Sequence, residues 1–194
     1  MKKTELILIV IVIVSILLSI VNLPGGVLFT TLSILSLSGL YFYLGLFLFN
    51  GIPLKGIFKK SSYKGLSVVR ILGTMFLGLV YAALLIGILF KFNYWPGGHF
   101  LLLTGINLLI LSIIVLFLKT LLSKTVFYKK YLFQSIAFLV VAVAFYFIPF
   151  GYIERIKFRN NPEILAVVEA LSKDINNQAL WDKYFYLSSR NNAQ

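Results

Sequence analysis

The chain has 194 residues, of which 60% are hydrophobic and 16% aromatic, and its mean hydropathy is +0.95. Because soluble domains contain roughly 45–50% apolar residues, this composition excludes a soluble globular fold for most of the chain. The sequence contains no cysteine, which excludes disulfides, thiolate metal sites, cysteine nucleophiles and lipoprotein attachment.

Five apolar stretches are long enough to cross a bilayer, which takes a helix of about 20 residues. We therefore predict an all-α, polytopic membrane protein with five transmembrane helices. The predicted spans are residues 6–22, 27–49, 66–90, 99–118 and 131–150. They make up a predicted transmembrane domain over residues 1–153, followed by an extramembrane helical tail over residues 154–194.

The first span is an apolar run that directly follows two basic residues, Lys2 and Lys3, and a signal peptide has the same arrangement. It is, however, long and rich in β-branched residues, and no small-x-small cleavage site precedes Asn22. We therefore favour an uncleaved membrane anchor over a cleaved signal.

Two short turns separate consecutive spans, Asn22-Leu23-Pro24-Gly25-Gly26 and Asn93-Tyr94-Trp95-Pro96-Gly97-Gly98. Proline restricts φ to a value that suits a turn, and the glycines accept the positive φ that closes it. Helices joined by so few residues must run antiparallel, so each turn is predicted to be the tip of a membrane hairpin. The two prolines are 72 positions apart, which either a parallel duplication or convergent turn chemistry explains.

The net charge of +12 is concentrated in three places: before the first span, between the second and third, and between the fourth and fifth. The residues concerned are Lys2, Lys3, Lys55, Lys59, Lys60, Lys64, Arg70, Lys119, Lys124, Lys129 and Lys130. Near the two turns the only cation is Lys91. This positive-inside pattern predicts a bacterial inner membrane protein with a cytoplasmic N-terminus and a periplasmic C-terminus. We expect the basic loops to attract anionic lipid, and we expect no nucleic-acid partner.

Small residues recur along the predicted third span at Thr74, Gly78 and Ala82, with Gly87 further on. Such spacing lets helix backbones approach closely in lipid. We favour packing within this protein, and the alternative is an interface with a second copy or another membrane protein. Asn107 in the fourth span is predicted to hydrogen-bond a neighbouring helix, with a ligand or ion contact as the alternative. Gln134 is predicted to lie near the cytoplasmic interface.

The tail contains five of the six acidic residues. Asn161-Pro162-Glu163 has the features of a helix start, with a capping residue, proline at the first position and an acid in the first turn. This helix is predicted to end near Lys173, and a second is predicted from Gln178 to Leu187. About forty residues are too few for a stable independent core, so we expect the tail to rest on the membrane domain or on a partner.

The inventory of reactive groups argues against an enzyme. His99 is the only histidine, and no acidic residue occurs between Leu6 and Ile153. No HExxH motif or phosphate-binding glycine loop is present, and the serines of the spans have no evident base. We therefore predict a protein with no catalytic, metal or cofactor site. Ion-coupled transport also loses support, because it usually depends on charged residues inside the membrane.

The second hairpin carries a resemblance to a known family. The stretch from Gly87 to Gly98, followed by Gly105, resembles the transmembrane hairpin of the gliding-motility protein GldL family. That family typically shows a Gly-x-Leu-Phe-Lys-Ile stretch, a histidine, then Trp or Leu, Pro, Gly and a small residue. The resemblance implies an inner-membrane protein of Bacteroidota, where the hairpin and a partner subunit form the proton-driven motor for gliding and type IX secretion. It covers roughly residues 70–118.

The departures from the family limit what the resemblance implies. The family's histidine is replaced by Tyr94, and the acidic residue that follows the glycine is absent from Ile106-Asn107-Leu108-Leu109. The family's long cytoplasmic C-terminal region is also absent. The resemblance therefore implies a related hairpin and cellular location, without the motor's carboxylate.

Together these observations predict a non-enzymatic scaffold or accessory subunit of a membrane complex, related to gliding motility or to type IX secretion. Its expected partners are the lipid bilayer and other membrane proteins, or a second copy of the chain. The alternative is a transporter or channel for a neutral or lipidic solute, centred on Asn107 and the serines of the second span. A third possibility is an enzyme that acts on lipid.

Overall fold

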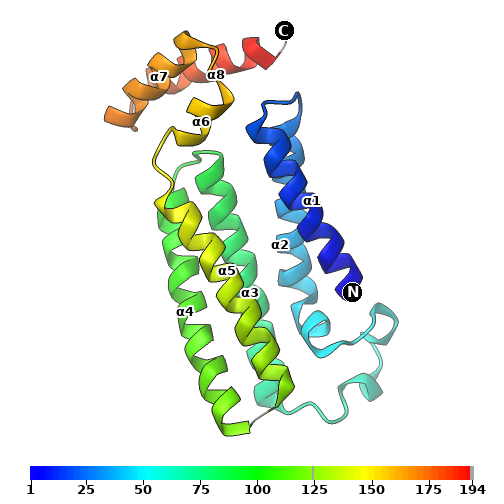
Figure 1. The fold of residues 1–194 in the computed structure, drawn as a ribbon. Coiled ribbons are helices and arrows are strands. Elements are labelled where there is room, and N and C mark those ends of the chain that lie inside the picture. The colour runs from blue at the N-terminus through cyan, green and yellow to red at the C-terminus, as the bar shows by residue number, and fades with distance from the viewer. Residues whose placement is uncertain (124, 193–194) are drawn as a thin grey trace. The chain divides into compact units, whose positions relative to one another are not determined.

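A computed structural model describes residues 1–123 and 125–192, which are helical with connecting turns and contain no strand (Figure 1). The long helices are α1 (Lys2–Ile20), α2 (Gly26–Asn50), α3 (Val68–Phe92), α4 (Gly98–Ser123) and α5 (Val126–Phe147). All five are long and apolar enough to cross a membrane. The predicted all-α, multi-pass fold is therefore confirmed.

Shorter elements complete the chain. Two 3₁₀ helices, η1 (Leu54–Gly56) and η2 (Lys60–Tyr63), lie in the loop before α3. The tail forms α6 (Tyr152–Lys157), α7 (Pro162–Lys173) and α8 (Gln178–Asn192). The short helix α6 was not predicted, and α8 continues five residues past the expected end at Leu187.

The helices around the second basic segment are longer than predicted. Helix α4 continues to Ser123 instead of residue 118, and α5 begins at Val126 instead of residue 131. Lysine is a good helix former, and its aliphatic stem can lie along an apolar surface, so a helix need not stop where an apolar run stops. For the same reason α1 begins at Lys2 rather than at residue 6. Lys124 lies outside the described residues.

The fifth long helix ends earlier than predicted, at Phe147 instead of residue 150. Pro149 follows two residues later, and a proline cannot supply the amide hydrogen that continues a helix. The residue before a proline is also driven away from the helical region. Sequence hydropathy therefore overestimated the helix at this end.

The two hairpin turns have the same backbone geometry. Asn22 and Tyr94 have φ values of 60° and 55°, and Gly25 and Gly97 have φ values of 78° and 80°. These pairs are related by the same 72-residue shift as the two prolines. Only glycine adopts this left-handed region without steric cost, which explains one glycine of each Gly-Gly pair.

The backbone hydrogen bonds of the two turns correspond in the same way. Leu23 N donates to Leu18 O at 3.1 Å, and Trp95 N donates to Phe90 O at 2.9 Å. Both bonds link a residue after the helix to a carbonyl five positions earlier, which satisfies a carbonyl that the helix leaves unpaired. The predicted hairpin turns are thus present, and they match in detail.

The chain divides into two compact units. Unit 1 comprises Met1–Val10 and Ser33–Phe147, and unit 2 comprises Ile11–Leu32 and Ile148–Gln194. Helices α1 and α2 are divided between the two units, and most of α2 belongs to unit 1. Unit 1 therefore contains α3, α4 and α5 complete, and unit 2 contains the first hairpin turn and the tail.

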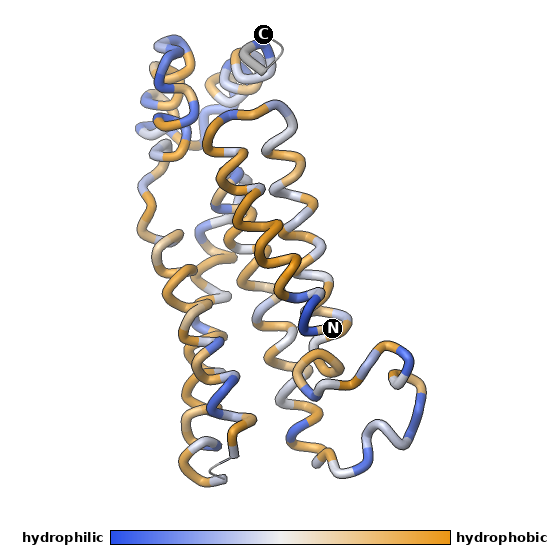
Figure 2. Tube along the Cα trace, turned by 45° about the vertical axis from the view of Figure 1, so that its right-hand side comes forward, coloured by the Kyte–Doolittle hydropathy of each residue, from blue (hydrophilic) through white to orange (hydrophobic). Residues whose placement is uncertain are grey.

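In unit 1, α3, α4 and α5 pack side by side (Figure 1). A Cβ atom on Gly87 would lie 2.7 Å from the Cα of Leu102, and one on Gly105 would lie 3.0 Å from the Cα of Leu84. The backbones of α3 and α4 are therefore in direct contact at two levels, which only glycine permits. Hydrophobic residues run along all three helices (Figure 2).

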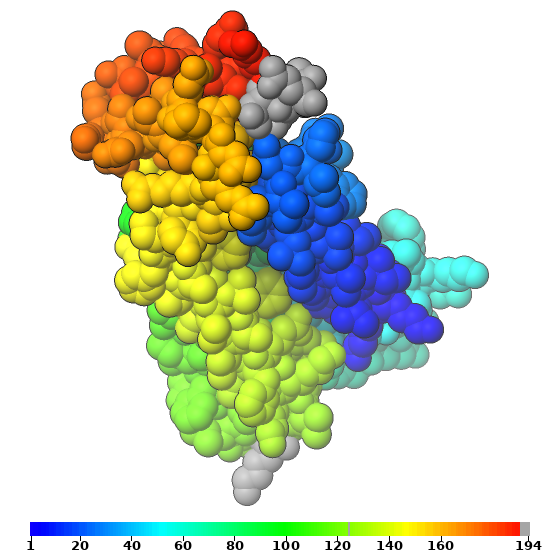
Figure 3. All heavy atoms as spheres, turned by 45° about the horizontal axis from the view of Figure 1, so that its top comes forward, coloured from blue at the N-terminus to red at the C-terminus, as the bar shows by residue number. Residues whose placement is uncertain are grey.

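In unit 2, the tail helices gather together, in orange and red in Figure 3, and they enclose a small apolar core. Phe158, Ile164 and Val168 are buried, and Leu165, Tyr184 and Leu187 pack against them. The predicted cap of α7 is present, since Asn161 Oδ1 accepts a hydrogen bond from Ile164 N at 3.3 Å.

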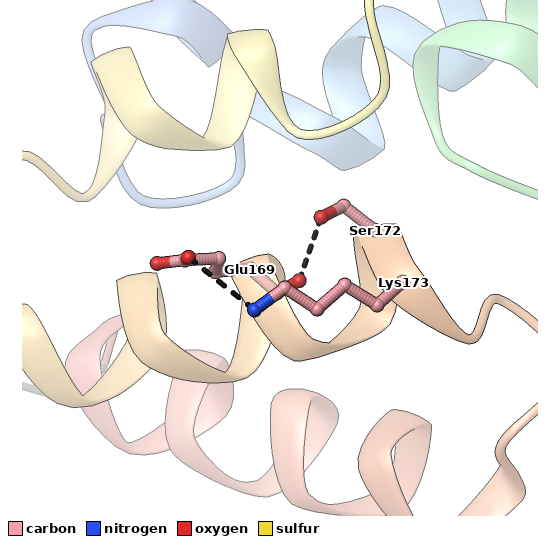
Figure 4. A network of polar contacts seen from close by, with 3 residues as sticks. All are labelled: Glu169, Ser172 and Lys173. Atoms are coloured by element: carbon pink, nitrogen blue, oxygen red, sulfur yellow. Dashed lines mark hydrogen bonds and ion pairs between the residues drawn. The ribbon is translucent and has the colours of Figure 1, made fainter.

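The outer face of α7 is polar. Lys173 Nζ lies 3.7 Å from Glu169 Oε1, and Ser172 Oγ donates to Glu169 O at 2.6 Å (Figure 4). Both charged side chains are largely exposed, so this pair contributes little to stability. The helix is thus amphipathic, with its apolar side on α8.

Candidate functional site

A hydrogen-bonded carboxylate lies between the helices of unit 1. Glu5 Oε1 accepts hydrogen bonds from Tyr41 Oη and from Gln134 Nε2, each at 2.8 Å. The three residues come from α1, α2 and α5, and Tyr41 is fully buried. We call Glu5, Tyr41 and Gln134 the polar cluster. It joins three helices through one carboxylate oxygen.

A second polar contact continues the polar cluster toward α3. Tyr81 Oη and Ser135 Oγ lie 2.8 Å apart, and both residues are fully buried. The rings of Tyr41 and Tyr81 meet edge to face at 5.2 Å, and Phe138 stacks on Tyr81 at 4.5 Å. Aromatic rings in such arrangements add to the stability of a buried core.

Tyr41 and Gln134 lie well inside their helices, whereas Glu5 is half-buried in the first turn of α1. Tyr41 is nine residues from the end of α2 at Asn50, and Gln134 is eight residues from the start of α5 at Val126. At 1.5 Å per residue these separations correspond to roughly 12–14 Å along the helix axes. Hydrogen bonds from these two side chains reach the Glu5 carboxylate at the start of α1, and polar or ionisable groups that pair between membrane-spanning helices are candidates for function.

The bonds from Tyr41 and Gln134 to Glu5 were not predicted from the sequence. Gln134 was predicted to lie near the cytoplasmic interface, and its bond to Glu5 in the first turn of α1 does not contradict that prediction. An acid in the first turn of a helix has an ordinary explanation, because it stabilises the helix N-terminus. The sequence did offer one indication of the polar cluster. Tyr41 and Gln134 are polar residues within apolar spans, and each needs a hydrogen-bond partner there.

A further polar network lies where α3 begins. Arg70 Nε donates to Asn50 Oδ1 at 2.7 Å, and Asn50 Nδ2 donates to Thr74 Oγ1 at 3.0 Å. The Arg70 guanidinium lies over the ring of Phe127, 3.8 Å from its centroid. The network joins α2, α3 and α5, and it fixes the orientation of the arginine.

The small residues singled out on α3 face two neighbours. A Cβ on Gly78 would lie 2.6 Å from Tyr41 O, so this glycine packs on α2. Ala82 is buried, and its carbonyl accepts a hydrogen bond from Ser38 Oγ at 3.2 Å. Thr74 is buried in the Arg70 network, whereas Gly87 packs on α4. The structure thus places all four within unit 1.

Asn107 lies apart from these groups. It is exposed on α4, and its amide forms no hydrogen bond with any of the described residues. The side chain lies near the middle of a helix that runs from Gly98 to Ser123. An amide carries donors and acceptors that lipid cannot satisfy.

An open apolar groove runs between α2, α3 and α4. It has a volume of about 740 Å³, and its lining includes Ser38, Gly39, Ala83, Thr104 and Gly105. The predicted centre of a transporter was Asn107 with the serines of α2. Ser38 lines the groove, whereas Asn107 does not, so the structure does not bring these residues together at one site.

The residues at the second turn make aromatic contacts. The ring of Trp95 meets Phe90 edge to face at 5.0 Å. His99, the one histidine of the sequence, stacks on Tyr146 with 4.6 Å between ring centroids. His99 therefore contributes to helix contact between α4 and α5.

The tail contains a buried acid. Glu154 is 4% exposed, and Tyr184 hydrogen-bonds it from α8. Burial raises the pKa of Tyr184, and the charge and hydrogen bond of Glu154 raise it further. Burial also lowers the pKa of Lys157, which the charge of Glu154 partly offsets. The hydrogen bond between Glu154 and Tyr184 links α6 to α8 within unit 2.

No family model, curated protein or solved structure matches this chain.

Proposed function

We propose that this protein is a non-enzymatic scaffold or accessory subunit that binds another membrane protein laterally through α4. The observation that carries the proposal is the exposed amide of Asn107 near the middle of an apolar helix. A polar amide facing lipid without a hydrogen-bond partner costs roughly 1–3 kcal/mol by protein mutational data. A polar residue on a facing helix removes that cost, and such bonds associate transmembrane helices.

The packing of unit 1 supports a subunit with a fixed shape. Glycines bring α3 and α4 into backbone contact, and the polar cluster ties α1, α2 and α5 together. These polar groups are satisfied within the chain, whereas Asn107 is directed outward. The contrast favours a rigid bundle that presents one polar residue to a partner.

We also propose the cellular setting. The distribution of basic residues supports a bacterial inner membrane protein with its N-terminus in the cytoplasm and its C-terminus in the periplasm. The resemblance of residues 87–98 to the GldL hairpin supports a role beside gliding-motility or type IX secretion components. A periplasm-reporting fusion after Gln194 should be active and one near Lys60 inactive, and the reverse result overturns the orientation.

Site-specific photo-crosslinking in native membranes tests the partner. A crosslinking amino acid at Leu111, one helical turn from Asn107 and also exposed, should give a discrete protein adduct. The adduct yield should fall severalfold when Asn107→Leu is combined with it. The same probe at Val140 on α5 serves as the control and should give lipid adducts alone. A chain that remains a solitary monomer with the probe at Leu111 overturns the proposal.

The apolar groove favours a second candidate, a transporter or channel for a lipidic solute. Its small lining residues leave a surface that an alkyl chain could occupy. Reconstituted vesicles containing a fluorescent phospholipid would report accelerated exchange between leaflets. Gly39→Trp should abolish that exchange, because no atom lies within 4 Å of a Cβ at Gly39 and the indole would extend into the groove. Exchange no faster than in protein-free vesicles removes this candidate.

A further inference from the structure

A partly open apolar slot lies at the end of unit 1 where α3 begins, α4 ends and α5 begins. It has a volume of about 120 Å³ and is lined by Val69, Gly73, Leu77, Leu116, Phe127 and Tyr131, among others. This volume is about ten times that required to hold one water molecule. The walls are almost entirely apolar, so a hydrocarbon group is a better occupant than water.

Two cations line the same slot. Arg70 is the third residue of α3, and Lys119 is four residues from the end of α4 at Ser123. Both are half-buried, so their stems lie along the slot while their charged ends can reach its mouth. An anion with an attached apolar group would therefore meet both kinds of surface at once.

Arg70 is oriented before any ligand arrives. Its Nε donates to Asn50 Oδ1 at 2.7 Å, and its guanidinium carbon lies over Phe127, 3.8 Å from the ring centroid. Asn50 is itself held by donating to Leu46 O at 2.9 Å and to Thr74. A fixed guanidinium loses little conformational entropy when it binds a phosphate oxygen. The network thus resembles the supporting shell of a binding site.

The charge of these cations is not balanced within unit 1. Glu5 is the single acidic residue in the sequence of unit 1, and it accepts hydrogen bonds from Tyr41 and Gln134. Among the described residues, neither Arg70 nor Lys119 forms an ion pair within 4.0 Å. An anion at the mouth of the slot would therefore meet two uncompensated positive charges.

We propose that this slot binds one anionic phospholipid, with the phosphate between Arg70 and Lys119 and part of an acyl chain in the slot. The apolar walls require a chain, and the two cations require an anion, so a phospholipid with net negative charge satisfies both. Basic pockets between transmembrane helices bind such headgroups. The site is distinct from the basic loops, which attract anionic lipid without shape complementarity.

Native mass spectrometry of the full chain in a neutral detergent tests the proposal, with phosphatidylglycerol and phosphatidylcholine as matched probes. We expect one saturable phosphatidylglycerol per chain, bound at least about tenfold more tightly than phosphatidylcholine, since charge-assisted hydrogen bonds distinguish the two. Lys119→Gln and Arg70→Gln should each weaken phosphatidylglycerol by about tenfold. Glycerol 3-phosphate should not compete, because it lacks the chain.

Two further variants distinguish a specific lipid site in the slot from non-specific attraction of anionic lipid to basic residues. Gly73→Leu should abolish saturable binding, because no atom lies within 4 Å of a Cβ at Gly73 and the leucine would fill the slot. Lys64→Gln removes an equal charge from the exposed loop and should leave the affinity unchanged. Circular dichroism checks that each variant is folded. If Arg70→Gln does not fold, Lys119→Gln still tests the contribution of the cations. Equal binding of the two lipids, competition by glycerol 3-phosphate, an equal loss with Lys64→Gln, or unchanged binding with Gly73→Leu would each overturn the proposal.

Discussion

The two membrane hairpins of this protein share one turn and differ in how their helices are held together. Their turns match in φ values and in backbone hydrogen bonds after a shift of 72 residues. The same shift relates Ser15 to Gly87 and Thr30 to Leu102. In the first hairpin Thr30 Oγ1 donates to Ser15 O at 2.8 Å. In the second hairpin Gly87 packs directly on Leu102.

Corresponding positions therefore make the helix contact in both hairpins, with different chemistry. In the first hairpin a hydroxyl donates a hydrogen bond to a backbone carbonyl of the other helix. In the second hairpin a glycine, which has no side chain, lets the two backbones touch. Both solve the same problem, since lipid provides no hydrophobic driving force between helices and contact must come from close packing or hydrogen bonds. Identical turns impose the same register on the helices they join, so a parallel duplication and convergent turn chemistry both explain it.

The largest expected effect is on the close approach in the second hairpin. Gly87→Leu places a branched side chain where a Cβ alone would lie 2.7 Å from the Leu102 backbone. We expect a loss of about 3 kcal/mol in unfolding free energy, at the upper end for overpacking. Reversible unfolding in mixed micelles measures it. Gly73→Ala on the same helix is the control and should be neutral or stabilising by up to about 1 kcal/mol; an equal loss there would contradict the assignment.

The polar cluster gives the next effect, at the other end of the first hairpin. Glu5→Leu leaves Tyr41 and Gln134 without their acceptor, which should cost about 2 kcal/mol. Glu5→Gln should cost less, because an amide oxygen still accepts. Thr4→Leu, at an exposed neighbouring position, should change stability little in the same unfolding experiment. Equal stability of Glu5→Leu and the parent would show that the cluster does not form.

The hydroxyl of the first hairpin gives a smaller effect. Thr30→Val keeps the shape of the side chain and removes the bond to Ser15 O, which should cost about 1 kcal/mol. Thr31→Val is a matched control, because Thr31 is half-buried beside Thr30 on α2 and its hydroxyl donates to Val27 O of the same helix at 2.9 Å. Unfolding of the two variants side by side should separate them by this amount. A Thr31→Val variant as unstable as Thr30→Val would argue against the cross-helix bond.

The turns give an effect of about the same size as the hydroxyl, and it should be equal in the two hairpins. Gly25→Ala and Gly97→Ala each force alanine to a φ near 80°, at a cost of about 1 kcal/mol. At neither glycine does a Cβ meet an atom within 4 Å, so the cost comes from the backbone alone. Thermal unfolding of both variants measures it. A large difference between them would show that the turns are not equivalent.

Much of the architecture could be predicted from the sequence because its signals are local. Apolar runs indicated five spans, Pro-Gly-Gly indicated the turns, and Asn161-Pro162 indicated the start of α7. The errors are also local. Lysines were taken as helix ends at α1, α4 and α5, although lysine continues a helix as readily as most residues.

The candidate site could not be predicted in the same way. Glu5 and Gln134 are 129 positions apart, and only the packing of α1 beside α5 brings them together. Asn107 was predicted to hydrogen-bond a neighbouring helix, and in the structure its amide bonds none of the described residues of this chain. A hydrogen bond from Asn107 to a neighbouring helix therefore requires a helix of a partner protein.

The sequence by itself determined the number of spans, the hairpin turns and the caps of the tail, because these depend on residues close together in the chain. The tertiary structure decided which way each helix faces, and therefore that Glu5 lies inward and Asn107 outward. The physical reason is that helices in lipid are apolar on all sides, so no amphipathic stripe marks the inner face. Glycine contacts and buried hydrogen bonds set the rotation of each helix instead, and they form only when the helices meet.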